Sequence, residues 1–176
     1  MRPVVYSLTA SLDGYINRAD GTLDWISTDL SMPPEQFFRE KFSAFDSVII
    51  GRKSYDTMRA MPGGGAYPGM TNYVVSRTIA PGRRDGFEFI SSDLKDWVEK
   101  LKNAPGKKIW LSGGGELARS FLEAGLMDEI EIAVQPILLG KGVPLFPGPF
   151  PESKLKLERA ERLGSAIVQL AYSVKR

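Results

Sequence analysis

The pattern that most constrains the fold is a short apolar run that ends in glycine and leads directly into a helical stretch. In "KKIWLSGGGELARSFLEAG", residues 109–111 form the apolar run, the triglycine 113–115 follows, and the helical pattern stops at Gly125. "VIIGRKSYDTM" repeats the arrangement, with a buried strand, Gly51 and a short helix over residues 53–58. Buried strands followed by helices are typical of a mostly parallel sheet. The pattern therefore predicts an α/β fold.

Further strands and helices are expected along the chain. Apolar and β-branched runs predict strands over residues 4–9, 71–77, 87–90 and 128–139. Pro33-Pro34 predicts a helix start, because proline suits the first helical turn, and Phe38, Phe42 and Phe45 follow at helical spacing. Ser92 can cap a further helix, whose apolar face is formed by Leu94, Trp97, Val98 and Leu101.

The last part of the chain has the pattern of a hairpin. Residues 155–163 and 167–174 flank Gly164-Ser165, a short connection. Strands that alternate with helices and then close in a hairpin predict a mostly parallel sheet with an antiparallel edge. The sequence shows no internal repeat and no linker, so we expect a single domain over residues 1–176.

The residues that the chain lacks restrict its chemistry. Its 176 residues include no cysteine and no histidine, which excludes thiolate catalysis, Ser-His-Asp hydrolysis and metal sites built on those side chains. The net charge of +2 is too small to indicate a nucleic-acid surface, and no apolar run is long enough to span a membrane. The first residues show no signal-peptide pattern. We therefore expect a cytoplasmic protein without a metal, whose chemistry depends on carboxylates, Tyr, Lys, water or a cofactor.

The triglycine is a weak phosphate motif when it is taken alone. Glycines at a helix start let a phosphate approach unpaired N–H groups. However, Gly115 is followed by Glu116 and Leu117, not by the Lys-Ser/Thr of NTPase loops, and consecutive glycines lack the spacing of the dinucleotide fingerprint. Glu116 would also oppose a phosphate. A tight strand-to-helix turn without a ligand remains the alternative.

Two other strand ends strengthen the phosphate interpretation. Gly51 is followed by Arg52, Lys53 and Ser54, which place two cations and a hydroxyl at a helix start. A solvated basic turn is the alternative there. Another strand ends in Ser76-Arg77, where the arginine can pair with a further phosphate. Because the carboxyl ends of parallel strands share one edge of a sheet, the three ends favour an extended ligand such as a phosphorylated dinucleotide.

These motifs, taken in order, resemble a known family. The set "SLTASLDGYI", "VIIGRKSYDTM", "YVVSRT", "IWLSGGGELARSFL" and "VQPILLGKGVPLFPG", closed by a hairpin, resembles the dihydrofolate reductase superfamily. It is most similar to the branch that contains the reductase domain of the bifunctional riboflavin-biosynthesis deaminase–reductases and its stand-alone bacterial relatives. The resemblance covers nearly the whole chain. It implies a three-layer α/β/α domain with a mixed, mainly parallel central sheet and an antiparallel C-terminal hairpin, assembled as a homodimer.

The resemblance implies NADPH as the cofactor. The central phosphates would be held by Gly51, Arg52, Lys53 and Ser54, and the adenosine 2′-phosphate would be recognised by Ser76 and Arg77. The nicotinamide amide would contact Ala10, and the loop over residues 16–25, which includes Gly21, would cover the cofactor and substrate. The diphosphate and nicotinamide would be lined by Ser112, Gly113, Gly114, Gly115, Glu116 and Leu117.

The candidate substrate residues are Asp13, Trp25, Glu35 and Gln135. The resemblance places Asp13 beside the nicotinamide, where it would contact substrate or help to deliver a proton, but Asp-Gly is also an ordinary turn pair. Glu35 falls where folate reductases carry a pterin-binding carboxylate, and its alternative is a first-turn acid that interacts with the helix dipole. Trp25 either covers the site as a lid or packs in the core.

The resemblance implies hydride transfer from NADPH to a C=N or C=O carbon of a small heterocyclic substrate. Asp13 and Glu35 are the candidate catalytic groups. The riboflavin-type substrate is 5-amino-6-(5-phosphoribosylamino)uracil, and Lys141 would meet its phosphate or be a solvated loop residue. Dihydrofolate is a less favoured substrate, because the loop at Met70 lacks the expected arginine and Ala133 replaces the expected threonine. A nucleotide-binding protein of this fold without turnover is the third interpretation. We expect no deaminase half.

Overall fold

A computed structural model describes residues 1–91 and 93–175 of the chain. Its strands are β1 (Val4–Ser11), β2 (Tyr15–Asn17), β3 (Phe45–Gly51), β4 (Thr71–Val75), β5 (Gly82–Arg84), β6 (Phe87–Ile90), β7 (Lys108–Gly113), β8 (Glu129–Gln135), β9 (Val143–Pro144), β10 (Leu155–Leu163) and β11 (Ile167–Val174). Its helices are α1 (Pro34–Ser43), α2 (Arg52–Ala60), α3 (Leu94–Asn103) and α4 (Gly115–Glu123). None of the helices in this described part has the length and apolar character needed to cross a membrane.

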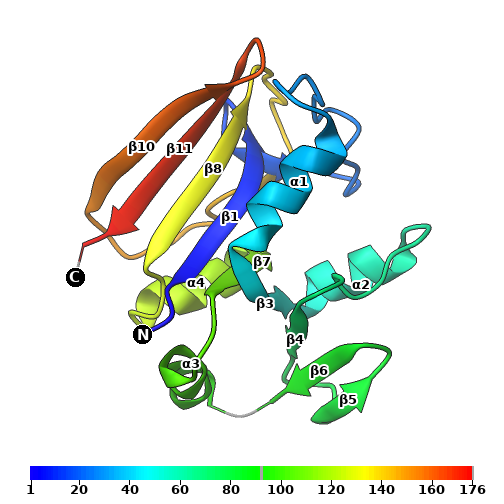
Figure 1. The fold of residues 1–176 in the computed structure, drawn as a ribbon, viewed down its shortest axis with the longest axis vertical. Coiled ribbons are helices and arrows are strands. Elements are labelled where there is room, and N and C mark those ends of the chain that lie inside the picture. The colour runs from blue at the N-terminus through cyan, green and yellow to red at the C-terminus, as the bar shows by residue number, and fades with distance from the viewer. Residues whose placement is uncertain (92, 176) are drawn as a thin grey trace.

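The centre of the molecule is a nine-stranded sheet in the order β10-β11-β8-β1-β7-β3-β4-β6-β5, and β2 pairs separately with β9. The neighbours from β8 to β6 run parallel to one another. In contrast, β11, β10 and β5 run antiparallel to their neighbours. Figure 1 shows the long hairpin of β10 and β11 at one edge of the sheet. The expected mainly parallel sheet with an antiparallel C-terminal hairpin is confirmed.

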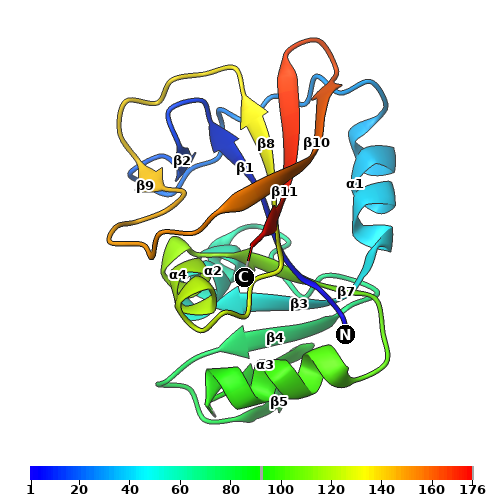
Figure 2. The ribbon, with the colours of Figure 1, turned by 90° about the vertical axis from the view of Figure 1, so that its left-hand side faces the viewer.

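Helices cover both faces of this sheet. Along β7, Ile109 belongs to one apolar cluster and the next residue, Trp110, to another, because successive strand residues point to opposite faces. Phe121 of α4 lies in the first cluster, together with residues of α3, whereas Phe42 of α1 and Tyr55 of α2 pack against the second. Burial of each large side chain contributes about 1.5–3 kcal/mol. The resulting three-layer arrangement is visible in Figures 1 and 2.

The expected stripe of Phe38, Phe42 and Phe45 on one helix is wrong. Helix α1 ends at Ser43, and Phe45 is the first residue of β3. Phe42 and Phe45 both contact Trp110, with ring centroids 4.8 and 6.4 Å from it, one ring coming from the helix and the other from the strand. Phe38 is 47% exposed. The spacing was misleading because a helix end and the following strand delivered two rings to the same core.

Other boundaries differ by a few residues. The strand expected over residues 71–77 ends at Val75, where Ser76 Oγ accepts hydrogen bonds from the N–H groups of Thr78 and Ile79 at 3.2 and 3.0 Å and so starts a turn. The strand expected over residues 128–139 ends at Gln135. Asp93 caps α3 by accepting from the N–H of Asp96 at 3.1 Å, and Ser92 lies outside the described residues.

Strand β1 loses one of its two neighbours partway along its length, and this opens the carboxyl end of the sheet. It pairs with β7 at Val4, Val5 and Tyr6, but it pairs with β8 from Val5 to Ser11. Near the same level, β7 has an irregularity against β3, so that Ile50 is opposite Gly113. Such irregularities re-aim strand ends and are frequent beside active sites. The ends of β1 and β7 are therefore not joined by a ladder.

The segment after β9 packs tightly on the start of α4. Tyr6 Oη donates to the carbonyl of Leu145 at 3.2 Å, and the N–H of Leu145 donates to the carbonyl of Gly14 at 2.8 Å. A Cβ atom at Gly115 would lie 2.2 Å from Pro147 Cδ. A side chain larger than hydrogen therefore cannot fit at Gly115 unless this segment moves.

We predict that Gly115→Ala lowers the free energy of unfolding by about 1–3 kcal/mol, because the added methyl overpacks a rigid proline ring. Urea denaturation monitored by tryptophan fluorescence measures the change. Gly65→Ala is the matched control, since the nearest atom to a Cβ there is 4.0 Å away. Equal stabilities of the two variants would contradict the packing seen at Pro147.

Candidate functional site

The structure brings the two predicted glycine motifs together. A Cβ atom at Gly51 would lie 3.5 Å from the carbonyl oxygen of Gly113, and a Cβ at Gly113 or Gly114 would lie 3.4 Å from Ser54 Oγ. Gly113 and Gly114 have φ values of 147° and 77°, which favour glycine. Two strand ends and the first turn of α2 therefore meet at positions that carry no side chain.

Two helices begin at this edge without a side-chain cap. Among the described residues, no side chain caps α2 after Gly51 or α4 after Gly114, whereas Asp93 caps α3. The first N–H groups of an uncapped helix are unpaired and carry a partial positive charge. Figure 2 shows α2 and α4 close to each other beside the ends of β3 and β7. This edge thus offers two converging sets of donors to an anionic ligand.

Only part of the expected positive charge is available to a ligand. Arg52 Nε lies 2.7 Å from the carboxylate of Asp56, so its charge is largely compensated. Lys53 and Arg77 are exposed, and no acidic partner is found for either within the described chain. Of the cations expected at the phosphates, Arg52 is thus paired inside its own helix. Arg119, which the sequence reasoning missed although it stands three residues after Glu116, pairs with that carboxylate at 3.3 Å.

Ser76 has a structural role in the cation-bearing turn. Its side chain is buried, and its two hydrogen bonds to Thr78 and Ile79 define the turn after β4. This turn presents Arg77 to solvent next to Thr78, whose hydroxyl accepts from Arg52 at 3.3 Å. The predicted pair thus divides into a residue that shapes the turn and a residue whose charge is free to bind.

Asp13 ties the turn after β1 to a distant loop. Its carboxylate accepts from Ser11 Oγ at 2.6 Å, from the N–H of Leu139 at 3.1 Å and from the N–H of Gly140 at 2.7 Å. The hydrogen bond from Ser11 and those from the two backbone groups lower the pKa of Asp13 below its ordinary value. An ionised carboxylate is an acceptor and cannot itself donate a proton. A contribution of Asp13 to catalysis stays a prediction.

The other predicted substrate residues lie in different environments. Gln135 is 3% exposed, and its Oε1 accepts from the N–H of Ser27 at 3.1 Å, which fastens the loop before α1 to the end of β8. Trp25 is 7% exposed, as the alternative of a core aromatic expects. Its indole N–H has no hydrogen-bond partner within the described residues. Glu35 is exposed in the first turn of α1, as the helix-dipole alternative expects.

Three further residues were expected at the cofactor: Ala10, Gly21 and Leu117. Ala10 is buried on β1 opposite Val134 of β8. Gly21 is at the tip of the loop over residues 16–25, where its N–H donates to the carbonyl of Arg18 at 2.9 Å and its carbonyl accepts from Asn17 Nδ2 at 2.9 Å. This loop is therefore held mainly by its own short-range hydrogen bonds. Leu117 is buried in the core beneath the triglycine, where a Cβ at Gly51 would lie 3.6 Å from it.

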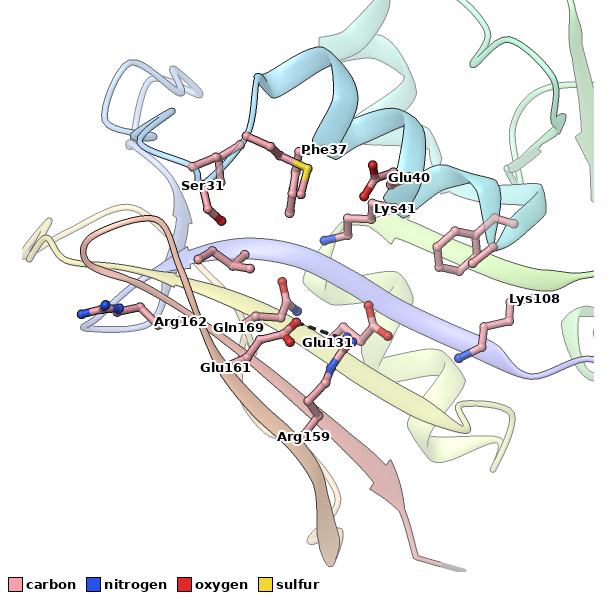
Figure 3. Close-up of a pocket in the computed structure, with 15 residues that line it drawn as sticks. Ser31, Phe37, Glu40, Lys41, Lys108, Glu131, Arg159, Glu161, Arg162 and Gln169 are labelled. Carbon is pink, nitrogen blue, oxygen red and sulfur yellow. Dashed lines mark ion pairs between the residues drawn. The ribbon is translucent and has the colours of Figure 1, made fainter.

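A cavity lies under α1, away from the glycine motifs, and the sequence reasoning missed it. It has a volume of about 540 Å³ and is bounded by α1, β8, β11 and β10. Figure 3 shows Lys41 pointing from α1 toward Glu131 and Gln169 on the sheet. Burial lowers the pKa of Lys41, and the nearby Glu131 carboxylate opposes that shift. Gln169 is 4% exposed, and its Nε2 has no hydrogen-bond partner among the described residues.

We predict that Asp13→Asn destabilises the folded protein at neutral pH, because an amide accepts hydrogen bonds less strongly than a carboxylate. The folded-state pKa of Asp13 is lowered, so its contribution is present above its ordinary pKa and is lost as the pH falls through the folded pKa. The difference in unfolding free energy between wild type and variant should therefore shrink from neutral to acid pH.

Urea denaturation at several pH values measures that difference, and hydrogen exchange at the amides of Leu139 and Gly140 reports the clamp directly. Asp24→Asn is the control for hydrogen exchange, since Asp24 pairs with Arg18 inside its own loop and its loss should leave both amides unchanged. A difference that stays constant with pH, or unchanged exchange at both amides, would contradict the role of Asp13.

Within the described residues, no group of three or more Asp or Glu side chains could hold a metal ion.

The chain is similar in sequence and in structure to known proteins. The chain is 32% identical over 171 residues to the uncharacterized protein YwjB of Bacillus subtilis, with 97% of each chain covered. Over the full length of both chains, it is 28% identical to a Shewanella sp. PV-4 protein provisionally named a riboflavin biosynthesis protein, with a TM-score of 0.82.

A more distant structure shows the fold class. Dihydrofolate reductase from Enterococcus faecalis, determined in complex with NADP(H), is 14% identical and has a TM-score of 0.68, with 99% of this chain and 97% of that chain covered. The fold is therefore that of the dihydrofolate reductases. The family model described as the RibD C-terminal domain matches residues 2–169. Nearly the whole chain thus belongs to the RibD C-terminal domain family.

Proposed function

We propose that the chain is an NADPH-dependent reductase that transfers a hydride to a C=O or C=N carbon of a small heterocyclic substrate. One observation carries this proposal: α2 and α4 begin without a side-chain cap where Gly51, Gly113 and Gly114 come together. Helix N-termini of this kind suit phosphate groups. Membership of the RibD C-terminal domain family supports an oxidoreductase function.

The residues present fit a phosphorylated dinucleotide. A Cβ atom at Gly113 or Gly114 would lie 3.4 Å from Ser54 Oγ, so glycine leaves the backbone beside this hydroxyl without a side chain; we call this place the cradle. We assign the diphosphate to this cradle, with Lys53 beside it, and the 2′-phosphate to Arg77, whose guanidinium is exposed. The related dihydrofolate reductase structure contains NADP(H). When bound, the cofactor supplies the hydride, and the protein supplies alignment and charge.

For the substrate we propose a phosphoribosylamino-pyrimidine, as in 5-amino-6-(5-phosphoribosylamino)uracil reductases. The Asp13 clamp fixes Gly140, and the exposed Lys141 follows directly, so a cation is held near the turn after β1. That cation suits the substrate phosphate. Glu35, Trp25 and Gln135 remain our candidates for contacts to the pyrimidine, and Asp13 and Glu35 for polarising a water molecule that delivers the proton. From the family resemblance we also propose a homodimer in the cytoplasm.

We predict that Arg77→Ala weakens NADPH binding by roughly ten- to a hundredfold, the range expected for losing charge-assisted hydrogen bonds. NADH lacks the 2′-phosphate, so its affinity should stay close to that of the wild type. Isothermal titration calorimetry with both nucleotides measures this. Arg39→Ala is the matched control, because Arg39 is an exposed arginine of α1. An unchanged ratio of NADPH to NADH affinity in Arg77→Ala would overturn the assignment.

Turnover separates the three functional interpretations. We expect the protein to oxidise NADPH when the phosphoribosylamino-pyrimidine is added, and not to oxidise it when dihydrofolate is added. The loss of absorbance at the dihydronicotinamide band measures the oxidation. Steady turnover of dihydrofolate would replace our substrate assignment. Tight NADPH binding without oxidation on either substrate would favour a nucleotide-binding protein that lacks turnover, and absence of NADPH binding would defeat the cofactor proposal itself.

A further inference from the structure

The cavity under α1 separates this helix from a polar stretch of the sheet. None of the ten residues of α1, all of which the structure describes, is buried. The cavity beneath them has a volume of about 540 Å³, which lies within the range of roughly 300–1,000 Å³ found for small-molecule pockets. Among the described residues that line it, none belongs to the two glycine motifs. The cavity is therefore a separate place where a ligand can bind.

The floor of the cavity presents a buried hydrogen-bond donor beside a carboxylate. Gln169 of β11 is 4% exposed, and its Nε2 has no hydrogen-bond partner among the described residues. An amide N–H is costly to bury unless an acceptor meets it. Glu131 of β8 lies diagonally from Gln169, because Gln169 is opposite Ala133 and Glu131 is opposite Ala171. Both cross-strand neighbours are small alanines, which leave room above the strand pair.

A second donor comes from the helix above. Figure 3 shows Lys41 extending from α1 toward Glu131 and Gln169. Its interaction with the Glu131 carboxylate is electrostatic and includes no hydrogen bond among the described residues. Burial lowers the pKa of Lys41, as expected for an ammonium that is withdrawn from water. Lys41 and Gln169 thus direct two donors to the space beside the Glu131 carboxylate.

The charges that line the cavity balance one another. Lys108 pairs with Glu129 at 2.6 Å, and Arg159 pairs with Glu161 at 3.5 Å. The charged lining residues that remain are Lys41, Arg162, Glu40 and Glu131. A simple anion or a simple cation would meet a like charge in this lining, whereas a ligand that carries both charges complements it.

An apolar region adjoins these polar groups. Its lining is formed by Leu30 and Met32 from the segment before α1, Phe37 from α1 and Leu163 from β10. A Cβ atom at Gly164 would lie 3.1 Å from Leu30 Cα, so the hairpin end that carries Leu163 is close to this segment. A ligand can therefore place an apolar group here while its polar head reaches the floor of the cavity.

We propose that this cavity binds an α-amino acid with a large apolar side chain. The carboxylate of the ligand accepts from Gln169 Nε2 and Lys41 Nζ, and its ammonium donates to the carboxylate of Glu131. The ligand's side chain lies against Phe37 and Leu163. The ligand thus gives the buried amide of Gln169 the acceptor that the described residues do not supply. This binding does not depend on the reductase function.

Calorimetric titration with L-phenylalanine tests the class of ligand. Phenethylamine keeps the ring and the ammonium but lacks the carboxylate, and 3-phenylpropionate lacks the ammonium. We expect L-phenylalanine to bind and each analogue to bind more weakly by roughly tenfold or more, because each analogue leaves charged or polar groups of the cavity without a partner. Absence of L-phenylalanine binding, or equal affinity for either analogue, would overturn the proposal.

Two variants of similar side-chain length test where the ligand binds. Gln169→Met and Lys41→Met each remove one donor, so each should weaken L-phenylalanine binding by roughly tenfold or more. Lys95→Met, at an exposed site on α3, is the matched control and should bind like the wild type.

Circular dichroism checks that every variant is folded, and titration with NADPH should give the wild-type affinity in all three. The two titrations are independent, so failure of the cofactor proposal would leave the result with L-phenylalanine intact. Wild-type affinity for L-phenylalanine in Gln169→Met or in Lys41→Met would overturn the proposal, because the ligand would then bind elsewhere.

Discussion

The close approach of backbone to backbone at Gly51, Gly113 and Gly114 is the constraint on which the candidate site depends. No side chain stands at these three positions, and Cβ atoms at Gly113 and Gly114 would lie 3.4 Å from Ser54 Oγ. The same approach leaves the starts of α2 and α4 beside each other without caps among the described residues. A helix end that is left unpaired in this way costs stability unless water or a ligand satisfies it. The cofactor that we propose would satisfy these N–H groups.

The architecture could be predicted because its signals are local. The hairpin over residues 155–163 and 167–174 has the predicted bounds, since its alternation and its turn lie within one short stretch. The convergence of the Gly51 and triglycine motifs was also predictable, because parallel strands deliver their carboxyl ends to one edge. The error at Phe45 shows the limit of periodicity. A spacing of three residues places two side chains on one helix face only if the backbone between them is helical. Between Phe42 and Phe45 the helix ends, and a strand begins at Phe45.

The charge balance of the site was less accessible to sequence reasoning. Asp13 accepts from the N–H of Gly140, which is 127 positions away in the chain, and no local pattern encodes such a contact. The partner of Arg52 is Asp56, a pair at helical spacing that was visible but was not weighed. The burial of Trp25 was left open between a lid and the core, because the surroundings of a loop residue are set by tertiary packing. Sequence therefore predicted which motifs meet in the structure better than it predicted which of their charges are paired.

The small sheet of β2 and β9 has a mechanical consequence. Asn17, where the loop over residues 16–25 begins, pairs with Val143, and the chain continues from there to Pro147, which rests on Gly115 at the start of α4. The loop expected to cover the site and the helix start expected to bind phosphate are thus joined by one short, stiff linkage. We expect the loop and the start of α4 to move together rather than independently, because only residues 144–146 separate the two contacts.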